Sequence, residues 1–370
     1  MIGFVLTGHG NFSLGLKSAV DMVAGDTPAF KAVPFDGTST DAYAADLRAA
    51  ISELHEECDG VVVFCDLLGG TPFNQAMLAS QVFSNIEVVA GVNLPMLIEL
   101  IVMRGAYATA EDTAEAVFTA LKLGYRHIDT AAYYGNEKAV GEGVRKAMKT
   151  LGLKREEISV ATKVWNTDRG YEKTLAAFEK SVKELDLGYV DLYLIHWPAN
   201  QKMFGDQAKE INASTWRALE ECYQSGRAKA IGVSNFLPHH LEELAATARI
   251  KPMVNQIEFH PGWAHLDVVE YCLKNEIIPE AWSPMARSGA LSNETLISLA
   301  EKYGKTPAQI CLRWVLQHGL RPIPKSVTPS RMAENLDIYD FIIEETDMAA
   351  IDALENCGGS CHNPDTIELY

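Results

Sequence analysis

The chain has 370 residues, of which 48% are hydrophobic and 22% are charged, so it can bury a sizeable core. At roughly 150 residues per domain, this length predicts two domains, or one large barrel with a further module. Its 49 acidic and 32 basic residues give a formal net charge of −17, which disfavours nucleic acids and anionic membranes as partners.

The sequence carries no sign of secretion or of membrane insertion. Seven cysteines, an odd number spread over a long chain, do not suggest a disulfide framework. The N-terminus begins with a strand pattern and lacks the basic start and cleavage site of a signal peptide. The most apolar stretch, residues 94–103, contains Pro95 and Glu99 and is about half the ~20 residues that a membrane span needs. We therefore expect a cytoplasmic protein.

The first hundred residues alternate between strand and helix patterns. Apolar runs typical of buried strands occur at residues 2–6, 61–65 and 86–90. A helical pattern at residues 13–24 follows the first run, and Thr71 and Pro72 supply an N-cap and a first-turn proline after the second. This alternation predicts an open, doubly wound parallel α/β sheet.

After about residue 104 the same alternation continues in longer and more regular units. Seven strand-like runs occur at residues 126–130, 159–164, 190–196, 230–234, 253–259, 277–283 and 321–326. Helical patterns separate most of them, for example at residues 174–187, 215–225 and 307–317. Polar residues at the strand ends are typical of a TIM-type (β/α)8 barrel, which places its chemistry at that face. The first of the eight strands is missing or truncated. We therefore predict two domains, residues 1–104 and 105–370.

The N-terminal domain offers a histidine at a strand end. His9 stands in T-G-H-G after the first strand, and Asp66 stands in C-D-L-L-G-G-T after a later one. A carboxylate bonded to one imidazole nitrogen fixes the tautomer and makes the other nitrogen a better nucleophile. Backbone amides at residues 69–71 open a helix and suit a phosphate. Together these features predict phosphoryl transfer through a phosphohistidine. Taken singly, His9 could be an ordinary loop histidine and Gly69-Gly70 an ordinary turn.

Three motifs in this domain resemble the IIA component of mannose-type sugar phosphotransferase systems. They are G-F-V-L-T-G-H-G, D-L-L-G-G-T-P-F-N and A-G-V-N-L-P-M-L, and they span residues 1–104. The resemblance implies that His9 accepts a phosphoryl group from the carrier protein HPr and passes it to a IIB component, with Asp66 as its partner. That family continues with a further helix and often an edge strand, which this sequence replaces.

The second domain offers the groups that carbonyl reduction needs. Hydride transfer to a carbonyl requires a proton donor, and a tyrosine beside a lysine ammonium can serve near neutral pH. Four candidates stand at or just after successive strand ends: Asp129, Tyr134, Lys163 and His196. Neighbouring strand ends of a barrel lie together, so we expect one shared site. Singly, these residues could also form a structural ion pair, a core aromatic and an interior histidine.

The motifs around these residues resemble the aldo-keto reductases, particularly the bacterial branch that includes 2,5-diketogluconate reductases. The resemblance covers about residues 105–370 and includes I-G-V-S-N-F, V-N-Q-I-E-F-H-P, A-W-S-P-M and I-P-K-S-V-T-P-S-R-M-A-E-N in order. It implies that Tyr134 is the general acid and that Lys163 lowers its pKa. It also implies that Asp129 pairs with Lys163 and that His196 orients the carbonyl oxygen.

The same resemblance implies a set of cofactor contacts. Ser234, Asn235 and Gln256 would hold the nicotinamide carboxamide, Trp282 would stack on the ring with Ser283 beside it, Lys325, Ser326 and Arg331 would bind the adenosine 2′-phosphate, and Glu334 and Asn335 would lie near the adenine. Two cations beside a phosphate favour NADPH over NADH. We expect no metal, because Cys357, Cys361 and His362 offer only three ligands in a Gly-Ser tail. We interpret that tail as a flexible loop near the substrate mouth.

The join between the domains makes conflicting demands on the same residues. The barrel family's opening hairpin has no counterpart, and only residues 105–107 could end its first strand. A gap in the barrel would expose two strand edges. Residues 101–107 are apolar enough to fill it, yet residues 94–104 also form the helix that the N-terminal domain needs. We expect residues 94–103 to be helical and residues 105–108 to be at most a short strand. A homodimer in which the neighbouring copy covers the gap is one solution.

Three functional hypotheses follow from this organisation. The first is an NADPH-dependent reductase of aldehydes or ketones, such as keto sugar acids or small dicarbonyls, fused to a phosphohistidine phosphocarrier. The second is primarily a sugar-uptake phosphocarrier with an impaired barrel, and the third is a fusion in which neither half is competent. We favour the first, because the barrel supplies most of the chain and the denser set of motifs.

Overall fold

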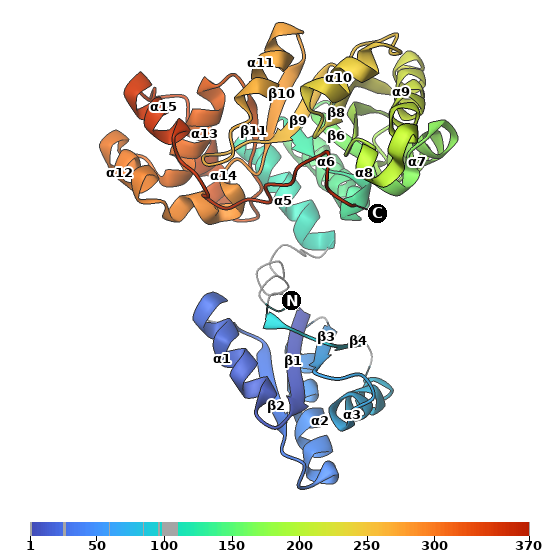
Figure 1. The fold of residues 1–370 in the computed structure, drawn as a ribbon, viewed down its shortest axis with the longest axis vertical. Coiled ribbons are helices and arrows are strands. Elements are labelled where there is room, and N and C mark those ends of the chain that lie inside the picture. The colour runs from blue at the N-terminus through green and yellow to red at the C-terminus, as the bar shows by residue number, and fades with distance from the viewer. Residues whose placement is uncertain are drawn as a thin grey trace. The chain divides into compact units, whose positions relative to one another are not determined.

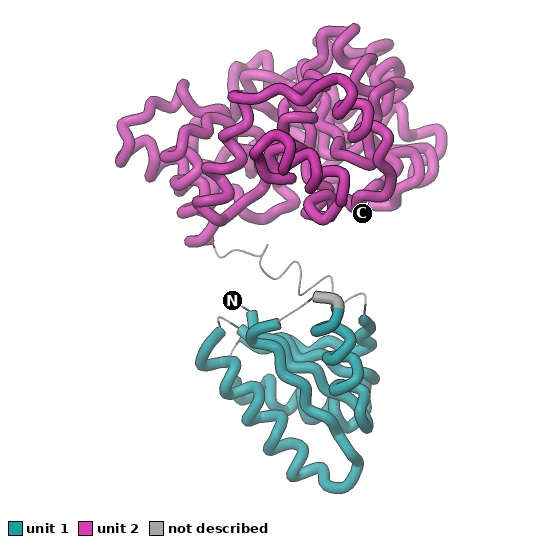
Figure 2. Tube along the Cα trace, turned by 90° about the vertical axis from the view of Figure 1, so that its left-hand side faces the viewer, with its two compact units in different colours: residues 1–109 teal, residues 110–370 magenta. Residues whose placement is uncertain are grey.

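The computed structural model describes residues 2–24, 27–58, 60–83, 85–94, 97 and 110–369. The chain divides into two compact units, residues 1–109 and 110–370 (Figure 2). Each unit has a parallel sheet of its own, and no strand of the described residues is shared between them. This confirms the predicted combination of an open α/β sheet and a barrel. The predicted boundary after residue 104 lies outside the described residues.

The N-terminal unit is a four-stranded parallel sheet with strand order β2-β1-β3-β4 (Figure 1). Its elements are β1 (Ile2–His9), α1 (Phe12–Ala24), β2 (Phe30–Phe35), α2 (Thr40–Glu57), β3 (Gly60–Cys65), α3 (Thr71–Ser80) and β4 (Ile86–Ala90). Successive side chains of a strand point to opposite faces. Accordingly Val5 packs in a core with Leu47 and Ile51 of α2, whereas Phe4 and Leu6 pack with Val20 of α1. Both faces of the sheet are therefore covered by helices.

The structure adds two elements that the sequence pattern did not indicate. β2 and α2 occupy the interval between the helix ending at Ala24 and the strand beginning at Gly60. Pro34 interrupts the strand pattern of β2, but β2 is an edge strand and pairs only with β1, in register Gly8 to Pro34. A proline is tolerated at a sheet edge because its missing N–H can face away from the partner strand.

The second unit is a seven-stranded, all-parallel sheet with strand order β11-β10-β9-β8-β7-β6-β5. Its strands are β5 (His127–Asp129), β6 (Ser159–Val164), β7 (Val190–Ile195), β8 (Ala228–Ser234), β9 (Val254–Glu258), β10 (Ile278–Trp282) and β11 (Arg321–Ile323). All seven predicted strands are present. The two outermost ones, β5 and β11, have only three residues each, and within the described residues nothing pairs with their outer edges.

Helices connect these strands and surround the sheet (Figure 1). They are α5 (Ala110–Leu123), α6 (Glu137–Leu151), α7 (Tyr171–Leu185), α8 (Gln201–Phe204), α9 (Ala208–Gln224), α10 (Pro238–Ala245), α11 (Leu266–Lys274), α12 (Glu294–Tyr303), α13 (Pro307–Gln317), α14 (Pro329–Leu336) and α15 (Glu345–Asp352), with short 3-10 turns η1 (Ala132–Tyr134), η2 (Arg155–Glu157), η3 (Asn166–Asp168), η4 (Gly205–Gln207) and η5 (Ala286–Ser292). The main core lies between strands and helices, and a second, smaller cluster contains Ala161, Leu192, Leu194 and Val254.

Most of the predicted join lies outside the described residues. Residues 98–109 lie outside the described residues, and of residues 94–103 only Leu94 and Leu97 are assigned, both as helical. No helix in the described part of the chain is both long and apolar enough to cross a lipid bilayer.

Candidate functional sites

The first site lies at the carboxyl edge of the N-terminal sheet. His9 ends β1 and Asp66 directly follows β3, and these two strands are neighbours with Thr7 opposite Cys65. The chain leaves β1 toward β2 on one side and β3 toward β4 on the other. Such a reversal of strand order opens a crevice at the strand ends, which is where open α/β sheets bind ligands.

His9 and Asp66 make two hydrogen bonds to each other. The backbone N–H of His9 donates to Asp66 Oδ2 at 2.8 Å, and the imidazole Nδ1 lies 2.9 Å from the same oxygen. The other carboxylate oxygen accepts the backbone N–H of Leu67 at 2.8 Å. An imidazole held through Nδ1 carries its proton there, so Nε2 has the lone pair. The predicted partnership of these two side chains is therefore geometrically possible.

Two glycines allow this close approach. A Cβ atom at Gly8 would lie 2.9 Å from Cγ of Asp66, and one at Gly70 would lie 2.8 Å from Cε1 of His9. Either atom would displace the imidazole or the carboxylate. The glycines in T-G-H-G and L-G-G-T thus have a packing role in addition to any role in forming the turns.

The site is open on the imidazole side. The side chain of His9 is 47% exposed, whereas that of Asp66 is 16% exposed. Burial by itself would raise the pKa of Asp66, but the hydrogen bonds from His9 outweigh burial and lower that pKa below its usual value. Asp66 is therefore ionised at neutral pH. The exposed side chains of Leu67 and Leu68 follow it directly.

The second site collects the four predicted residues of the barrel. Asp129 ends β5, Tyr134 ends the adjacent turn η1, Lys163 lies in β6 and His196 directly follows β7. Because β5, β6 and β7 are consecutive neighbours, their carboxyl ends bring the side chains together. The ring of Tyr134 lies 5.8 Å from that of His196, and the ammonium of Lys163 lies 5.3 Å from the centre of the Tyr134 ring.

Lys163 is a buried cation held by Asp129. Its side chain is 1% exposed, and its Nζ donates to Asp129 Oδ1 at 2.5 Å and to the carbonyl of Thr130 at 3.0 Å. Burial, the largest single influence, would lower the pKa of Lys163, but the charge and hydrogen bond of Asp129 together with the charges of Tyr134 and Glu280 raise the net pKa. A buried ammonium persists only with such a partner. Lys163 is therefore charged at neutral pH.

His196 is neutral in this environment. Its side chain is buried, and burial together with the positive charges of Lys163 and Arg169 lowers its pKa well below the ordinary value. Its Nδ1 is buried without a hydrogen-bond partner among the described residues. The indole of Trp165 packs edge-on against it with ring centroids 5.0 Å apart. A neutral imidazole can donate or accept a hydrogen bond, but it cannot supply the proton of an imidazolium.

Tyr134 departs in one respect from the expectation based on the resemblance. Burial raises the pKa of its hydroxyl, and the charge of Lys163 lowers it, as expected, but by less. Asp129 neutralises part of the lysine charge and acts in the raising direction. The net pKa of Tyr134 is therefore raised, although the residue is 49% exposed.

The residues expected to hold a carboxamide form one hydrogen-bonded network. Asn235 donates to the carbonyl of His196 at 3.0 Å and accepts from the indole N–H of Trp282 at 2.9 Å. The hydroxyl of Ser234 donates to the carbonyl of Gln256 at 2.7 Å, and the amide of Gln256 donates to Asp129 at 2.9 Å. The network links these four residues to the ion pair of Lys163 and Asp129.

The residues expected at a phosphate lie around the start of α14. Lys325 and Ser326 precede this helix, Arg331 lies in its first turn, and neither cation has a carboxylate partner within the described residues. Partial burial lowers the pKa of Lys325. Two unpaired cations beside a helix N-terminus suit a phosphate group. Ser283, after β10, adopts a positive φ of 50°, which begins a strained loop of the kind that occurs at ligand sites.

The two residues expected near an adenine are partly committed elsewhere. Glu334 accepts the hydroxyl of Thr306 at 2.7 Å, and Asn335 is buried in α14. These contacts fix α14 against the start of α13. The hydrogen-bond donors and charges of the expected cofactor residues fit a phosphorylated dinucleotide. The cations Lys325 and Arg331 support this fit most strongly.

Sequence reasoning missed the residues that hold the C-terminal tail. Glu258, buried at the end of β9, accepts the backbone N–H groups of Ser360 at 2.6 Å and Cys361 at 2.8 Å. Asn200 donates to the carbonyls of Pro364 and Ile367. The signal in the sequence that could have revealed these contacts was the carboxylate of Glu258 in the motif at the end of a predicted strand. The tail is thus fixed by hydrogen bonds, whereas the sequence analysis expected a flexible loop.

The tail also brings three polar side chains together. Among the described residues, His239, His240 and Asp365 are close enough to share an ion. However, Nδ1 of His240 accepts the backbone N–H of Leu237, so its Nε2 carries the proton that points to Asp365 at 3.1 Å. We therefore interpret the group as hydrogen bonds that hold the C-terminal tail against α10. Cys357, Cys361 and His362 form no such group in the described part of the chain.

Comparison with protein families identifies both units. The aldo/keto reductase family matches residues 103–356, and the family described as the PTS system fructose IIA component matches residues 3–118. The two matched ranges overlap across the join. This confirms the two resemblances inferred from the sequence motifs.

Individual relatives match the barrel unit. Glyoxal reductase of Bacillus subtilis is 50% identical over 256 residues, which are 69% of this chain and 88% of that protein. Methylglyoxal reductase DkgA of Escherichia coli is 42% identical over 250 residues, 67% of this chain and 86% of that protein.

Solved structures agree. An aldo-keto reductase from a Medee basin deep-sea metagenome matches with a TM-score of 0.65 at 43% identity, over 71% of this chain and 93% of its own. A Bombyx mori aldo-keto reductase in complex with NADP matches with a TM-score of 0.62 at 36% identity, over 66% and 83%. The chain therefore belongs to the aldo/keto reductase family and carries a IIA domain of the sugar phosphotransferase system at its N-terminus.

Proposed function

We propose that the barrel reduces small aldehydes and ketones with NADPH and that Tyr134, Lys163, Asp129 and His196 carry the reaction. The observation that supports this most strongly is the buried Lys163–Asp129 ion pair beside Tyr134 and a neutral His196. When bound, NADPH supplies the hydride that adds to the carbonyl carbon. Lys325 and Arg331 would hold its 2′-phosphate, and Ser234, Asn235 and Gln256 its carboxamide.

The proton is assigned to Tyr134. His196 is neutral at pH 7, so it donates a hydrogen bond that orients the carbonyl oxygen but does not protonate it. Tyr134 donates its hydroxyl proton to that oxygen as the alkoxide develops. The ammonium of Lys163, which Asp129 holds at 2.5 Å, stabilises the tyrosinate that remains.

The substrate class follows from the relatives and from the site's aromatic walls. Tyr133 stacks on Trp165 with ring centroids 3.9 Å apart, and both rings lie beside His196. Planar aromatic walls suit a small, flat carbonyl compound. The names of two relatives, glyoxal reductase and methylglyoxal reductase, point to the same class. We therefore propose small dicarbonyls such as methylglyoxal as substrates, ahead of keto sugar acids.

Substitution of the proton donor tests this proposal. We expect Tyr134→Phe to lower kcat for methylglyoxal reduction by ~10²–10⁴-fold, because the substitution removes only the hydroxyl. NADPH oxidation measured at 340 nm gives the rate, and quenching of protein fluorescence gives the NADPH dissociation constant, which should stay within about twofold. Wild-type turnover in the variant would exclude Tyr134 as the acid. Tyr271→Phe, in α11 and outside the site, is the matched control.

We also propose that the N-terminal domain is a phosphocarrier, with Nε2 of His9 as the phosphoryl acceptor. The exposed imidazole held through Nδ1 by Asp66 supports this assignment. HPr is the proposed donor and a IIB component the proposed acceptor. A homodimer and a cytoplasmic location remain predictions.

Phosphoryl transfer from HPr tests the second proposal. Incubation with HPr and its upstream kinase should label wild-type protein, and His9→Ala should remove the label. His55→Ala, which changes another histidine of the same domain, should not. Phosphohistidine is labile in acid, so the protein must be separated at alkaline pH. A label that survives in the His9 variant would overturn the assignment.

A further inference from the structure

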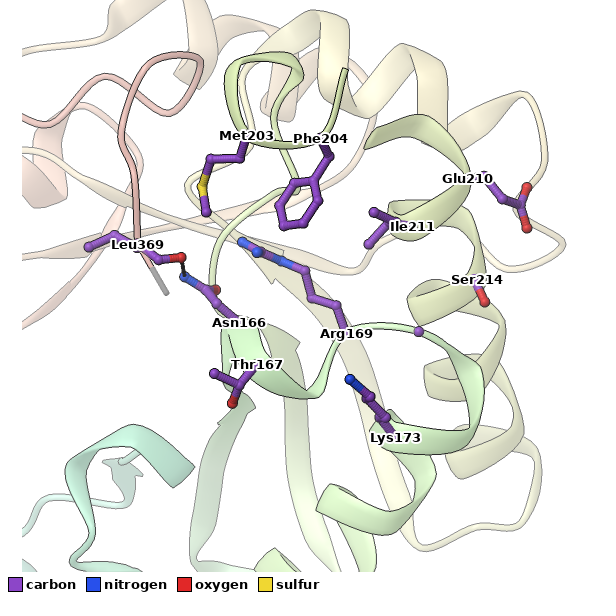
Figure 3. A pocket seen from close by; sticks show the side chains of 11 residues that line it. Asn166, Thr167, Arg169, Lys173, Met203, Phe204, Glu210, Ile211, Ser214 and Leu369 are labelled. Carbon is purple, nitrogen blue, oxygen red and sulfur yellow. Dashed lines mark hydrogen bonds between the residues drawn. The ribbon is translucent and has the colours of Figure 1, made fainter. Parts of the chain in front are cut away.

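A cavity of about 470 Å³ lies on the barrel unit apart from the four residues of the reductase site (Figure 3). It is bounded by the turn after β6, the start of α7, the short helix α8, α9 and the C-terminal tail. The residues that matter for its chemistry are Asn166, Arg169, Lys173, Phe204 and Ile211. Asp129, Tyr134, Lys163 and His196 do not line it.

The cavity carries two cations that have no carboxylate partner within the described residues. Arg169 donates through Nη2 to the carbonyls of Trp197 and Pro198, and its Nε is buried without an acceptor. Burial lowers its pKa to about 10, so it stays charged at neutral pH. Lys173 extends toward Arg169 from the first turn of α7 (Figure 3).

The acidic residue in the lining does not cancel these charges. Glu210 pairs with Arg217 at 2.7 Å, and its carboxylate points away from Arg169 in Figure 3. Arg169 and Lys173 are therefore not neutralised by a carboxylate of the described lining, in a protein whose formal charge is −17. A guanidinium N–H without an acceptor is an anion-binding group.

The rest of the lining is mixed. Met203, Phe204 and Ile211 form an apolar wall, and the Phe204 ring lies 5.4 Å from the Arg169 guanidinium. Asn166 is only 7% exposed, and its Oδ1 has no hydrogen-bond partner in the described part of the chain. This amide oxygen is an acceptor, so an O–H or N–H donor such as water, and not the carboxylate of a ligand, would satisfy it.

We propose that this cavity binds a small organic acid, with its carboxylate on Arg169 and Lys173 and its alkyl chain on Met203, Phe204 and Ile211. Two cations with an apolar side chain beside one of them, Phe204 at the Arg169 guanidinium, match a carboxylate with a short alkyl chain better than they match inorganic phosphate. The volume is within the range of small-molecule sites.

The site is also linked to the loop of the reductase site. The two carbonyls that Arg169 holds belong to Trp197 and Pro198, which directly follow His196. The acid therefore binds beside that loop without occupying the position of the carbonyl substrate.

Calorimetric titration of the full-length protein with hexanoate at pH 7 tests the site. We expect saturable binding with one molecule per chain, and at least tenfold weaker binding of hexan-1-ol, which lacks the charge, and of inorganic phosphate, which lacks the chain. No saturable binding of hexanoate, or phosphate binding of equal strength, would overturn the proposal.

Variants locate the binding. Lys173→Gln should weaken hexanoate binding about tenfold, the loss expected for one charged contact, and Ile211→Trp should abolish it by filling the cavity. Lys180→Gln, two turns further along α7, should have no effect. We avoid Arg169 because its substitution also frees the carbonyls after His196. Equal binding by wild type, Lys173→Gln and Ile211→Trp would place the acid elsewhere.

The titration needs neither NADPH nor a carbonyl substrate, so it is independent of the proposed reaction. Tyr134→Phe should bind hexanoate as wild type does. In the wild-type enzyme hexanoate should not compete with methylglyoxal. Purely competitive inhibition at the calorimetric dissociation constant would show that the acid occupies the substrate site and would overturn the proposal.

Discussion

At the scale of single residues, each site has a carboxylate that holds a nitrogen-containing side chain, but the two side chains differ in solvent exposure. Asp66 holds His9, whose side chain is 47% exposed, whereas Asp129 holds Lys163, which is 1% exposed. The exposed pair can be reached by the surface of another protein. The sealed pair can be reached only by a small molecule. This difference in exposure agrees with the proposals of a protein partner for the first site and a small carbonyl substrate for the second.

Removing the charge of Asp66 should impair His9 without unfolding the domain. Asp66→Asn keeps the size of the side chain, but its amide cannot stabilise an imidazolium or fix the same tautomer. We expect the initial rate of phosphoryl transfer from HPr to fall at least tenfold, measured by quenched flow and alkaline gels. Asp36→Asn, at another exposed carboxylate of the domain, should not change the rate. Equal rates for wild type and Asp66→Asn would contradict the role.

The ammonium of Lys325, which has no carboxylate partner in the part of the chain that the structure describes, should distinguish the two nicotinamide cofactors. Lys325→Ala should raise the NADPH dissociation constant about tenfold or more, because a charged contact to a phosphate contributes roughly 1.5–3 kcal/mol. The NADH dissociation constant should change less than twofold. Fluorescence titration measures both, with Lys180→Ala as the control. Equal losses for both cofactors would refute the assignment to the 2′-phosphate.

At the scale of elements, the barrel depends on its two shortest strands. β5 and β11 have three residues each and are the ends of the seven-stranded sheet. Between them, the fully buried carboxylate of Glu280 accepts a hydrogen bond from Arg321 at 2.8 Å. Buried backbone groups without a partner cost free energy on the order of 1–3 kcal/mol each. This gap is the place where the barrel should open first.

Amide hydrogen exchange should reveal that difference. We expect the amides of β5 and β11 to exchange at least tenfold faster than those of β7, which is paired on both sides. Exchange measured by mass spectrometry on the full-length chain gives the comparison within one sample. Equal protection of β5, β7 and β11 would show that the gap is closed.

The C-terminal tail should respond to acid through His240. Burial and the charge of His239 lower the pKa of His240 from its ordinary 6.5 to about 4. Between about pH 6.5 and 4, His240 stays neutral in the folded state but binds a proton in the unfolded state. The free energy of unfolding therefore decreases as the pH falls through this range. At 1.36 kcal/mol per pKa unit, the loss is about 3 kcal/mol. His240→Gln should flatten the dependence of the melting temperature on pH in this window, and His239→Gln should do so less.

Two outcomes would contradict the prediction for His240. A wild-type melting temperature that is constant from pH 7 to 4.5, or an unchanged slope in His240→Gln, would show that His240 does not stay neutral in the fold. Buried His196 shifts in the same direction, so some slope should remain in the variant.

At the scale of the whole molecule, the described residues form separate core clusters and separate sheets in the two units. Units without a shared core can unfold in separate steps, so one free energy of unfolding does not describe the chain. A ligand that binds one unit raises the stability of that unit by about 2.7 kcal/mol at a concentration of 100 times its dissociation constant.

Calorimetry of the full-length chain should therefore show two unfolding transitions. NADPH at saturation should raise the temperature of one transition by several degrees and leave the other in place. The Lys325→Ala variant should lose most of the shift at the same NADPH concentration. One transition that moves as a whole would show that the two units unfold together.

The sequence alone was sufficient for the families, the seven barrel strands and the residues at the strand ends, because these features depend on local pattern and order along the chain. It missed β2, since Pro34 obscures a strand whose place at a sheet edge is decided by its neighbour. It also described the tail as flexible, because the bonds from Glu258 and Asn200 join residues that are more than 100 positions apart.

The electrostatic state of the site depended on tertiary structure. The sequence indicated that Lys163 should lower the pKa of Tyr134, but burial and Asp129 decide the net direction. Likewise, the cavity around Arg169 is assembled from the turn after β6, α7, α8, α9 and the tail, and no single motif contains it. Desolvation and long-range charge depend on which segments pack together, so only the folded chain determines them.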